Sequence, residues 1–186
     1  MSLKKIIILS VIIFILIAII ILIMLGCSNM PPEKALNKFL KQIEKGNIDD
    51  ISLTIYYLNP NILTFLALDV NGLIDYAQTE KFVIDGVQLT EEAEHIDLFK
   101  QIGSVTLVPY VHEDSLLNAR IYYVFKNKNS KIFDVTMWGG WDEISIYING
   151  KEFKMNDIFI DIIISFLPEY AAENLEKFKQ HEGKFR

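Results

Sequence analysis

The chain has 186 residues, of which 51% are hydrophobic, and its 18 basic and 24 acidic residues give a formal net charge of −6. This acidic balance excludes binding to nucleic acid or to an anionic membrane surface through bulk charge, and it leaves a cationic or neutral partner. The single cysteine excludes an internal disulfide, so any folded domain must be stabilised by a packed core.

The N-terminal segment has the pattern of an export signal. Lys4 and Lys5 precede an apolar run, residues 6–26, that carries no charge. A basic flank before such a run keeps the N-terminus in the cytoplasm. At about 1.5 Å per residue the run would form a helix roughly 30 Å long, which is the thickness of the hydrocarbon core of a bilayer. Its length by itself favours an uncleaved signal-anchor helix.

The end of the run favours cleavage instead. It reads Met24-Leu25-Gly26-Cys27, which resembles the lipobox of bacterial lipoproteins. In that motif a diacylglycerol carrying fatty acids such as palmitate is joined to the cysteine thiol, and a peptidase cuts just before it. The resemblance implies a signal peptide at residues 1–26 and a lipid attached to Cys27. With either anchor, the residues that follow lie on the extracytoplasmic face of the cell membrane.

The remainder has the length of one domain. Residues 27–32 would form a short tether, and residues 33–186 a single extracytoplasmic domain of ordinary size. Without Lys4 and Lys5, 16 basic groups face 24 acidic groups, so the mature chain carries a net charge of −8.

The first half of the domain alternates between helical and strand patterns. Pro31-Pro32 opens a helix to about Lys45 with apolar residues on one face and lysines on the other. Apolar residues at every second position predict a strand at 51–57, and residues 62–69 fit neither pattern. We then expect a short helix from Asp69 to residue 77 and a strand at 81–84. A hairpin at Asp85-Gly86 should lead into a strand at 87–89. Thr90 should cap a helix that runs to Gly103 and buries Ala93, Ile96, Phe99 and Ile102.

The second half reads as a meander of strands followed by two helices. The predicted strands cover residues 105–110, 120–126, 132–138, 143–148 and 151–155, and Asn149-Gly150 is the clearest hairpin signal in the chain. Asn156 caps a mostly apolar helix to Leu167, which we expect to be buried. Pro168 starts a last helix whose inner stripe is Tyr170, Ala171, Leu175 and Phe178.

This order of elements predicts an α+β fold. We expect a mainly antiparallel sheet with helices packed on one face and the second face partly exposed, preceded by the N-terminal hydrophobic signal or anchor helix.

The stretch Trp138-Gly139-Gly140-Trp141-Asp142-Glu143 is the most distinctive one in the domain. Two tryptophans beside two acids could form a platform for a sugar, a peptide or a cationic group, so the candidate ligand-binding residues are Trp138, Trp141, Asp142 and Glu143. The competing interpretation, which the large apolar area of tryptophan favours, places both tryptophans in the core and lets the glycines turn the chain.

Two histidines lie near acidic residues. Glu91 and His95 are four apart, a spacing that can place two metal ligands on one face of a helix. No second pair accompanies them, so a solvated acidic face is the simpler interpretation, and we predict no metal site. His112-Glu113-Asp114, in a predicted loop, could bind a cation or act in acid–base chemistry, but a polar turn explains it more simply.

Sequence motifs of known chemistry are absent. No Gly-x-Ser-x-Gly elbow, P-loop or His-Glu-x-x-His motif occurs, and we predict no cofactor. Dispersed carboxylates can still act as acid and base, so an envelope-acting hydrolase that uses Asp142, Glu143 and His112 remains an alternative.

A family resemblance rests on three parts of the chain. These are Gly26-Cys27-Ser28-Asn29 after the leader, the strand at 51–58 followed by Asn59-Pro60, and Ile148-Asn149-Gly150-Lys151-Glu152-Phe153 with Asp157-Ile158-Phe159 and Phe166-Leu167-Pro168 behind it. In this layout the chain resembles small uncharacterised lipoproteins of low-GC Gram-positive bacteria, which implies a location and no mechanism. We expect a membrane-anchored, non-catalytic binding or accessory module for an unknown protein or small-molecule ligand. Besides the hydrolase, the alternative is a single-pass membrane protein with a purely structural domain.

Overall fold

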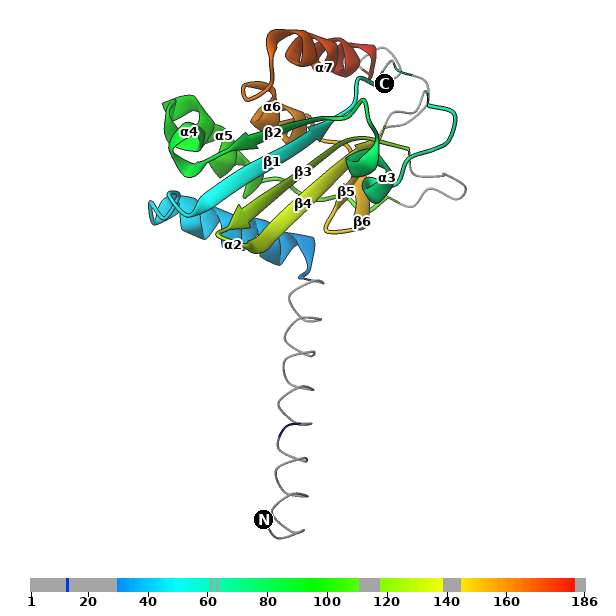
Figure 1. Cartoon of the computed structure of the whole chain (residues 1–186). Coiled ribbons are helices and arrows are strands. Elements are labelled where there is room, and N and C mark those ends of the chain that lie inside the picture. Colours follow the sequence, from blue (N-terminus) through cyan, green and yellow to red (C-terminus); the bar gives the residue numbers. More distant parts are fainter. Residues whose placement is uncertain are drawn as a thin grey trace, which may run out of the picture. The chain divides into compact units, whose positions relative to one another are not determined.

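An antiparallel sheet forms the centre of the fold (Figure 1). The computed structural model describes Ile13 and residues 30–60, 62, 64–110, 118–138 and 145–182. The chain divides into two units, Met1–Pro31 and Pro32–Arg186, and the sheet with its covering helices belongs to the second. Within the described residues the strands are β1 (Ile51–Tyr57), β2 (Glu80–Ile84), β3 (Ala119–Asn127), β4 (Ser130–Trp138), β5 (Ser145–Ile148) and β6 (Lys151–Lys154), in the order β2-β1-β3-β4-β5-β6. The predicted α+β class with an antiparallel sheet is confirmed.

Local sequence patterns account for most of the strands. In β1 every second side chain, from Ile51 to Tyr57, is buried, and the side chains between them are half-exposed, as the alternation predicted. The predicted hairpin joins β5 to β6. Asn149 and Gly150 there have φ values of 50° and 75°, the left-handed conformation that a two-residue hairpin turn requires.

The main core lies between one face of this sheet and four helices. They are α2 (Pro32–Glu44), α5 (Ala93–Ile102), α6 (Ile158–Ile164) and α7 (Glu169–Glu182). Helix α2 contacts β4 and α5, α5 contacts α6, and α6 contacts α7. Phe39 of α2 lies at the centre, with its ring 5.6 Å from that of Phe99 and 4.7 Å from that of Phe125. Helix α6 is mostly buried, as predicted, although it ends at Ile164 rather than Leu167.

One helix departs from the expected one-sided arrangement. Helix α3 (Val70–Asp75) begins at Asp69, whose carboxylate accepts a hydrogen bond from the Gly72 amide at 2.6 Å, as the sequence suggested. Its Leu73 packs with Leu58 and against Tyr56 and Tyr122, which point away from the main core. The prediction that the helices pack on one face is therefore wrong for α3, because capping positions a helix along the chain but does not choose a face of the sheet.

The predicted hairpin at Asp85-Gly86 is also wrong. Asp85 instead caps helix α4 (Gly86–Thr90), since its carboxylate accepts from the Gln88 amide and the Gln88 side chain accepts from the Asp85 amide. Gly86 is required by close packing, because a Cβ there would lie 2.3 Å from the Ile48 carbonyl oxygen. Thr90 ends α4 rather than capping the next helix, and its hydroxyl donates to the Gly86 and Val87 carbonyls.

The strand predicted at 105–110 forms only a single bridge, between Pro109 and Phe153 of β6. The segment still runs beside β6, since the Lys154 amide donates to the Val108 carbonyl at 2.9 Å and the Tyr110 amide to the Glu152 carbonyl at 3.3 Å. Both hydrogen bonds of this bridge are made by the residues on either side of Pro109, so its missing amide hydrogen removes neither of them.

Candidate binding surface

The site residues predicted from sequence fall mostly outside the described part of the chain. Trp138 ends β4, where its backbone pairs with Ala119. Outside the described residues lie Cys27, Trp141, Asp142, Glu143 and His112-Glu113-Asp114. Ligand binding at the tryptophans and lipid attachment at Cys27 stay predictions.

His95 belongs to the core and not to a solvated acidic face. Helix α5 begins at Ala93, two residues later than a Thr90 cap predicts. Its buried side chains are His95, Phe99 and Ile102, whereas Ala93 is exposed and Ile96 is half-buried. The His95 ring lies 4.5 Å from the ring of Phe166, measured between centroids. Glu91 precedes the helix, so the spacing argument for a metal no longer applies. Among the described residues, no group of three or more His, Cys, Asp or Glu side chains could hold a metal ion.

The loop between β1 and α3 exposes two large apolar side chains. Phe65 is fully exposed and Leu66 is 71% exposed, whereas Ile62 and Leu68 are half-buried against Leu58, Leu73 and Ala119. The ends of this segment are therefore packed while its tip faces solvent. Two adjacent large apolar side chains on a surface are a candidate site of contact with a partner or a ligand. We call Phe65 and Leu66 the apolar tip.

Arg120 of β3 is hydrogen-bonded to the loop that carries the apolar tip. Its side chain is only 4% exposed, and one guanidinium nitrogen, Nη2, donates to the Thr64 hydroxyl at 3.2 Å. The other, Nη1, donates to Asn118 Oδ1 at 2.7 Å, and the same Oδ1 accepts from the Leu68 amide at 3.3 Å. Burial lowers the pKa of the Arg120 guanidinium, and the nearby Tyr76 partly opposes this shift. One buried cation thus ties both sides of the loop to the sheet.

A row of polar and aromatic side chains crosses the second face of the sheet. Successive cross-strand partners along it are Lys81, Tyr56, Tyr122, Thr136, Tyr147 and Glu152. The rings of Tyr56 and Tyr122 stack with centroids 5.9 Å apart, and Lys81 Nζ lies 5.6 Å from the centre of the Tyr56 ring. Tyr122 donates to Asp134, and burial together with this carboxylate raises the pKa of its hydroxyl. Because Leu73 of α3 packs against Tyr56 and Tyr122, these rings serve the packing of α3 on this face.

The apolar tip was missed by the sequence reasoning. The segment from Ile62 to Leu68 contains no charged residue, yet its apolar residues fit neither the helical nor the strand period. The signal in the sequence that could have pointed to the tip is an uncharged apolar segment without periodicity, directly after the Asn59-Pro60 turn. It could not show which side chains would be buried, because that depends on contacts with Arg120 and α3.

Replacing Arg120 with Met is expected to loosen this loop. Hydrogen bonds to charged groups contribute about 1.5–3 kcal/mol each, so we expect the Leu68 and Ala119 amides to exchange hydrogen at least roughly tenfold faster. Hydrogen exchange read by NMR measures this directly. Lys126→Met on the same strand is the control and leaves both rates unchanged. Equal rates in the Arg120 variant and the wild type would contradict the role given to Arg120.

Comparisons with known protein families, with curated proteins and with solved structures found no match for this chain. The resemblance to small lipoproteins therefore stays a prediction. Among the residues that the structure describes, no helix is both long and apolar enough to cross a membrane.

Proposed function

We propose that this chain is a lipoprotein held at the extracytoplasmic face of the cell membrane through Cys27, and that its domain is a non-catalytic binding or accessory module. The anchor is supported by the basic flank, the apolar run and Gly26-Cys27. The binding role is supported by the apolar tip. Its partner would be a protein or a small molecule, neutral or cationic because the mature chain carries an excess of acidic groups.

The exposed Phe65 is the observation that carries the binding role. Burying a side chain such as Phe or Leu stabilises by about 1.5–3 kcal/mol relative to leaving it in water. Phe65 gains none of this free energy within the described fold and Leu66 only a small part of it, so most of the gain is open to a partner. Because Thr64 and Leu68, on either side of the tip, are already hydrogen-bonded to Arg120 and Asn118, a partner would lose little free energy in fixing the two side chains between them.

The binding role is tested by crosslinking in intact cells. A photoreactive residue in place of Leu66, in the full chain, is expected to yield a discrete adduct that Phe65→Ser reduces several-fold. The control position is Lys128, at the exposed turn between β3 and β4, where no such adduct is expected. Equal adduct patterns at positions 66 and 128, or a yield that Phe65→Ser leaves unchanged, would remove the support for a docking tip.

The anchor is tested separately by mass spectrometry of the N-terminal peptide. The lipoprotein form begins at an acylated Cys27. An intact N-terminus with an unmodified Cys27 in the membrane fraction would indicate the single-pass alternative, and the same peptide in the cytosol would contradict both anchors.

A further inference from the structure

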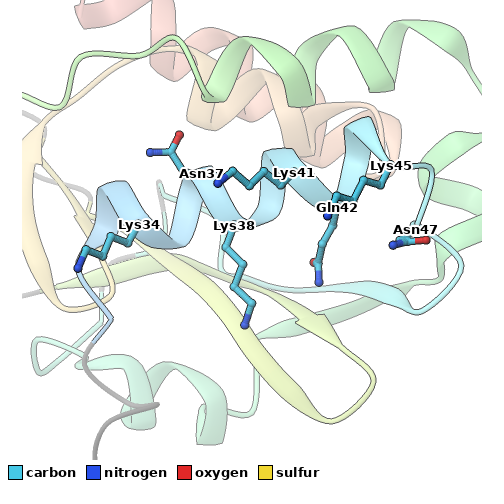
Figure 2. Close-up of a pocket in the computed structure, with 7 residues that line it drawn as sticks. All are labelled: Lys34, Asn37, Lys38, Lys41, Gln42, Lys45 and Asn47. Atoms are coloured by element: carbon cyan, nitrogen blue, oxygen red, sulfur yellow. The ribbon is translucent and has the colours of Figure 1, made fainter.

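Helix α2 carries a stripe of lysines along its outer face. Figure 2 shows Lys34, Lys38, Lys41 and Lys45 spread along the helix, from its first turn to the residue after its end. At about 100° per residue these four positions fall within an arc of roughly 60°. They line a shallow surface depression of about 590 Å³ together with Asn37, Gln42 and Asn47. We call these four residues the lysine stripe.

Within the described part of the chain, none of the stripe lysines forms an ion pair, as is also true of Lys81, Lys126, Lys151 and Lys154. Ion pairs are formed instead by Lys100, Lys128, Lys131, Lys177 and Lys179. The acids of the same helix, Glu33 and Glu44, lie on a neighbouring arc. All four lysine side chains are exposed, so their ammonium groups are available to an external anion.

The net negative charge of the domain does not cancel this local charge. At physiological ionic strength, charges more than about 8 Å apart across solvent are largely screened from each other. A flat anionic surface placed against α2 would therefore meet the stripe and not the sum of the distant carboxylates. Bulk charge excludes binding to such a surface, but this local arrangement allows it.

The position of the stripe in the sequence suggests which anionic surface it meets. Helix α2 begins at Pro32, five residues after Cys27, so an extended chain could separate the two by at most roughly 18 Å. The stripe itself extends over about 16 Å of helix from Lys34 to Lys45. A stripe that begins so close to the membrane anchor and runs along a helix can lie flat on the bilayer surface.

We propose that the lysine stripe binds anionic lipid headgroups of the membrane that holds the chain, and so orients the domain on its surface. This inference rests on the membrane anchor proposed above. A lipid anchor combined with a basic patch is a recurrent two-signal mode of membrane binding, in which each lysine near the surface strengthens binding by roughly fivefold. The opposite face of α2 carries the core residues that contact the sheet and α5, so the rest of the domain would face away from the bilayer.

The test uses the full chain in vesicles, with a water-soluble amine-reactive reagent read by mass spectrometry. We expect the four stripe lysines to be protected in vesicles that contain equal parts phosphatidylcholine and phosphatidylglycerol, and labelled in phosphatidylcholine alone. Raising the salt to about 1 M, where the Debye length is about 3 Å, is expected to abolish the protection. The exposed Lys151 and Lys154 of β6 serve as internal controls and label equally in both vesicles.

A pair of variants separates binding from mere accessibility. The double substitution Lys34→Gln and Lys45→Gln is expected to lower the binding constant of the stripe for the anionic headgroups by roughly 25-fold, at about fivefold for each lysine removed. The protection of Lys38 and Lys41 from labelling should weaken accordingly. Lys151→Gln with Lys154→Gln is expected to leave it unchanged. Equal labelling of the stripe in both kinds of vesicle overturns the inference. Protection by added polyphosphate but not by phosphatidylglycerol assigns the stripe to a soluble polyanion and overturns it as well.

The same preparation distinguishes failure of this inference from failure of the anchor. A chain that floats with phosphatidylcholine vesicles while its stripe is never protected is anchored but not oriented by α2. A chain that does not float with either vesicle lacks the anchor, and both proposals then fail.

Discussion

Replacing Phe39 with Ala is expected to lower the free energy of unfolding by about 3–5 kcal/mol, the range measured when a buried Phe is truncated. Phe39 is completely buried, and its ring contacts those of Phe99, Phe125 and Phe133 at centroid distances of 5.6, 4.7 and 5.2 Å. The cavity would open where α2, α5 and two neighbouring strands meet, so the surrounding side chains cannot all move in to fill it. Urea unfolding followed by circular dichroism measures the loss.

Phe65→Ala is the matched control because it makes the same chemical change at a fully exposed position. Its effect on unfolding is expected to stay within about 0.5 kcal/mol, as for most surface substitutions. If the two variants were equally stable, either the aromatic core or the exposure of the apolar tip would be wrongly placed.

Raising the pH above 10 is expected to destabilise the domain steeply, and Tyr123 contributes to this. Tyr123 is completely buried, its hydroxyl donates to the Phe159 carbonyl at 2.9 Å, and burial raises the pKa of that hydroxyl well above its ordinary value of 10.0. Above pH 10 the unfolded chain loses this proton while the folded chain keeps it. The contribution of Tyr123 to the free energy of unfolding is therefore complete below pH 10. It falls as the pH rises above 10, by up to about 1.4 kcal/mol per pH unit for this one group.

Tyr123→Phe isolates that contribution. The variant is expected to lose about 1 kcal/mol at neutral pH, because the hydrogen bond to Phe159 is gone. Its stability should then fall less steeply than that of the wild type above pH 10, since one proton fewer is linked to unfolding. Urea unfolding at a series of pH values from neutral to alkaline gives both slopes. Parallel slopes above pH 10 would show that Tyr123 titrates as an exposed tyrosine does.

Part of the proposed functional surface was visible in the sequence and part was not. The lysines of α2 could be placed opposite its apolar face from the helical period alone. That they lack acidic partners within the described residues became evident only in the folded domain, where the ion pairs involve other lysines. Phe65 was assigned no role, because an apolar residue in a segment without periodicity is normally part of the core.

The sequence by itself determined the features that depend on neighbours along the chain. The alternation in β1, the Asp69 cap and the Asn149-Gly150 turn were all readable, since each depends on contacts a few residues apart. Tertiary structure decided which face of the sheet α3 covers, the burial of His95 and the exposure of Phe65. Those outcomes depend on contacts between residues far apart in the chain, such as Arg120 with Thr64 and His95 with Phe166. Periodicity records which side of an element is apolar, but the partner that covers it is chosen only when the elements pack together.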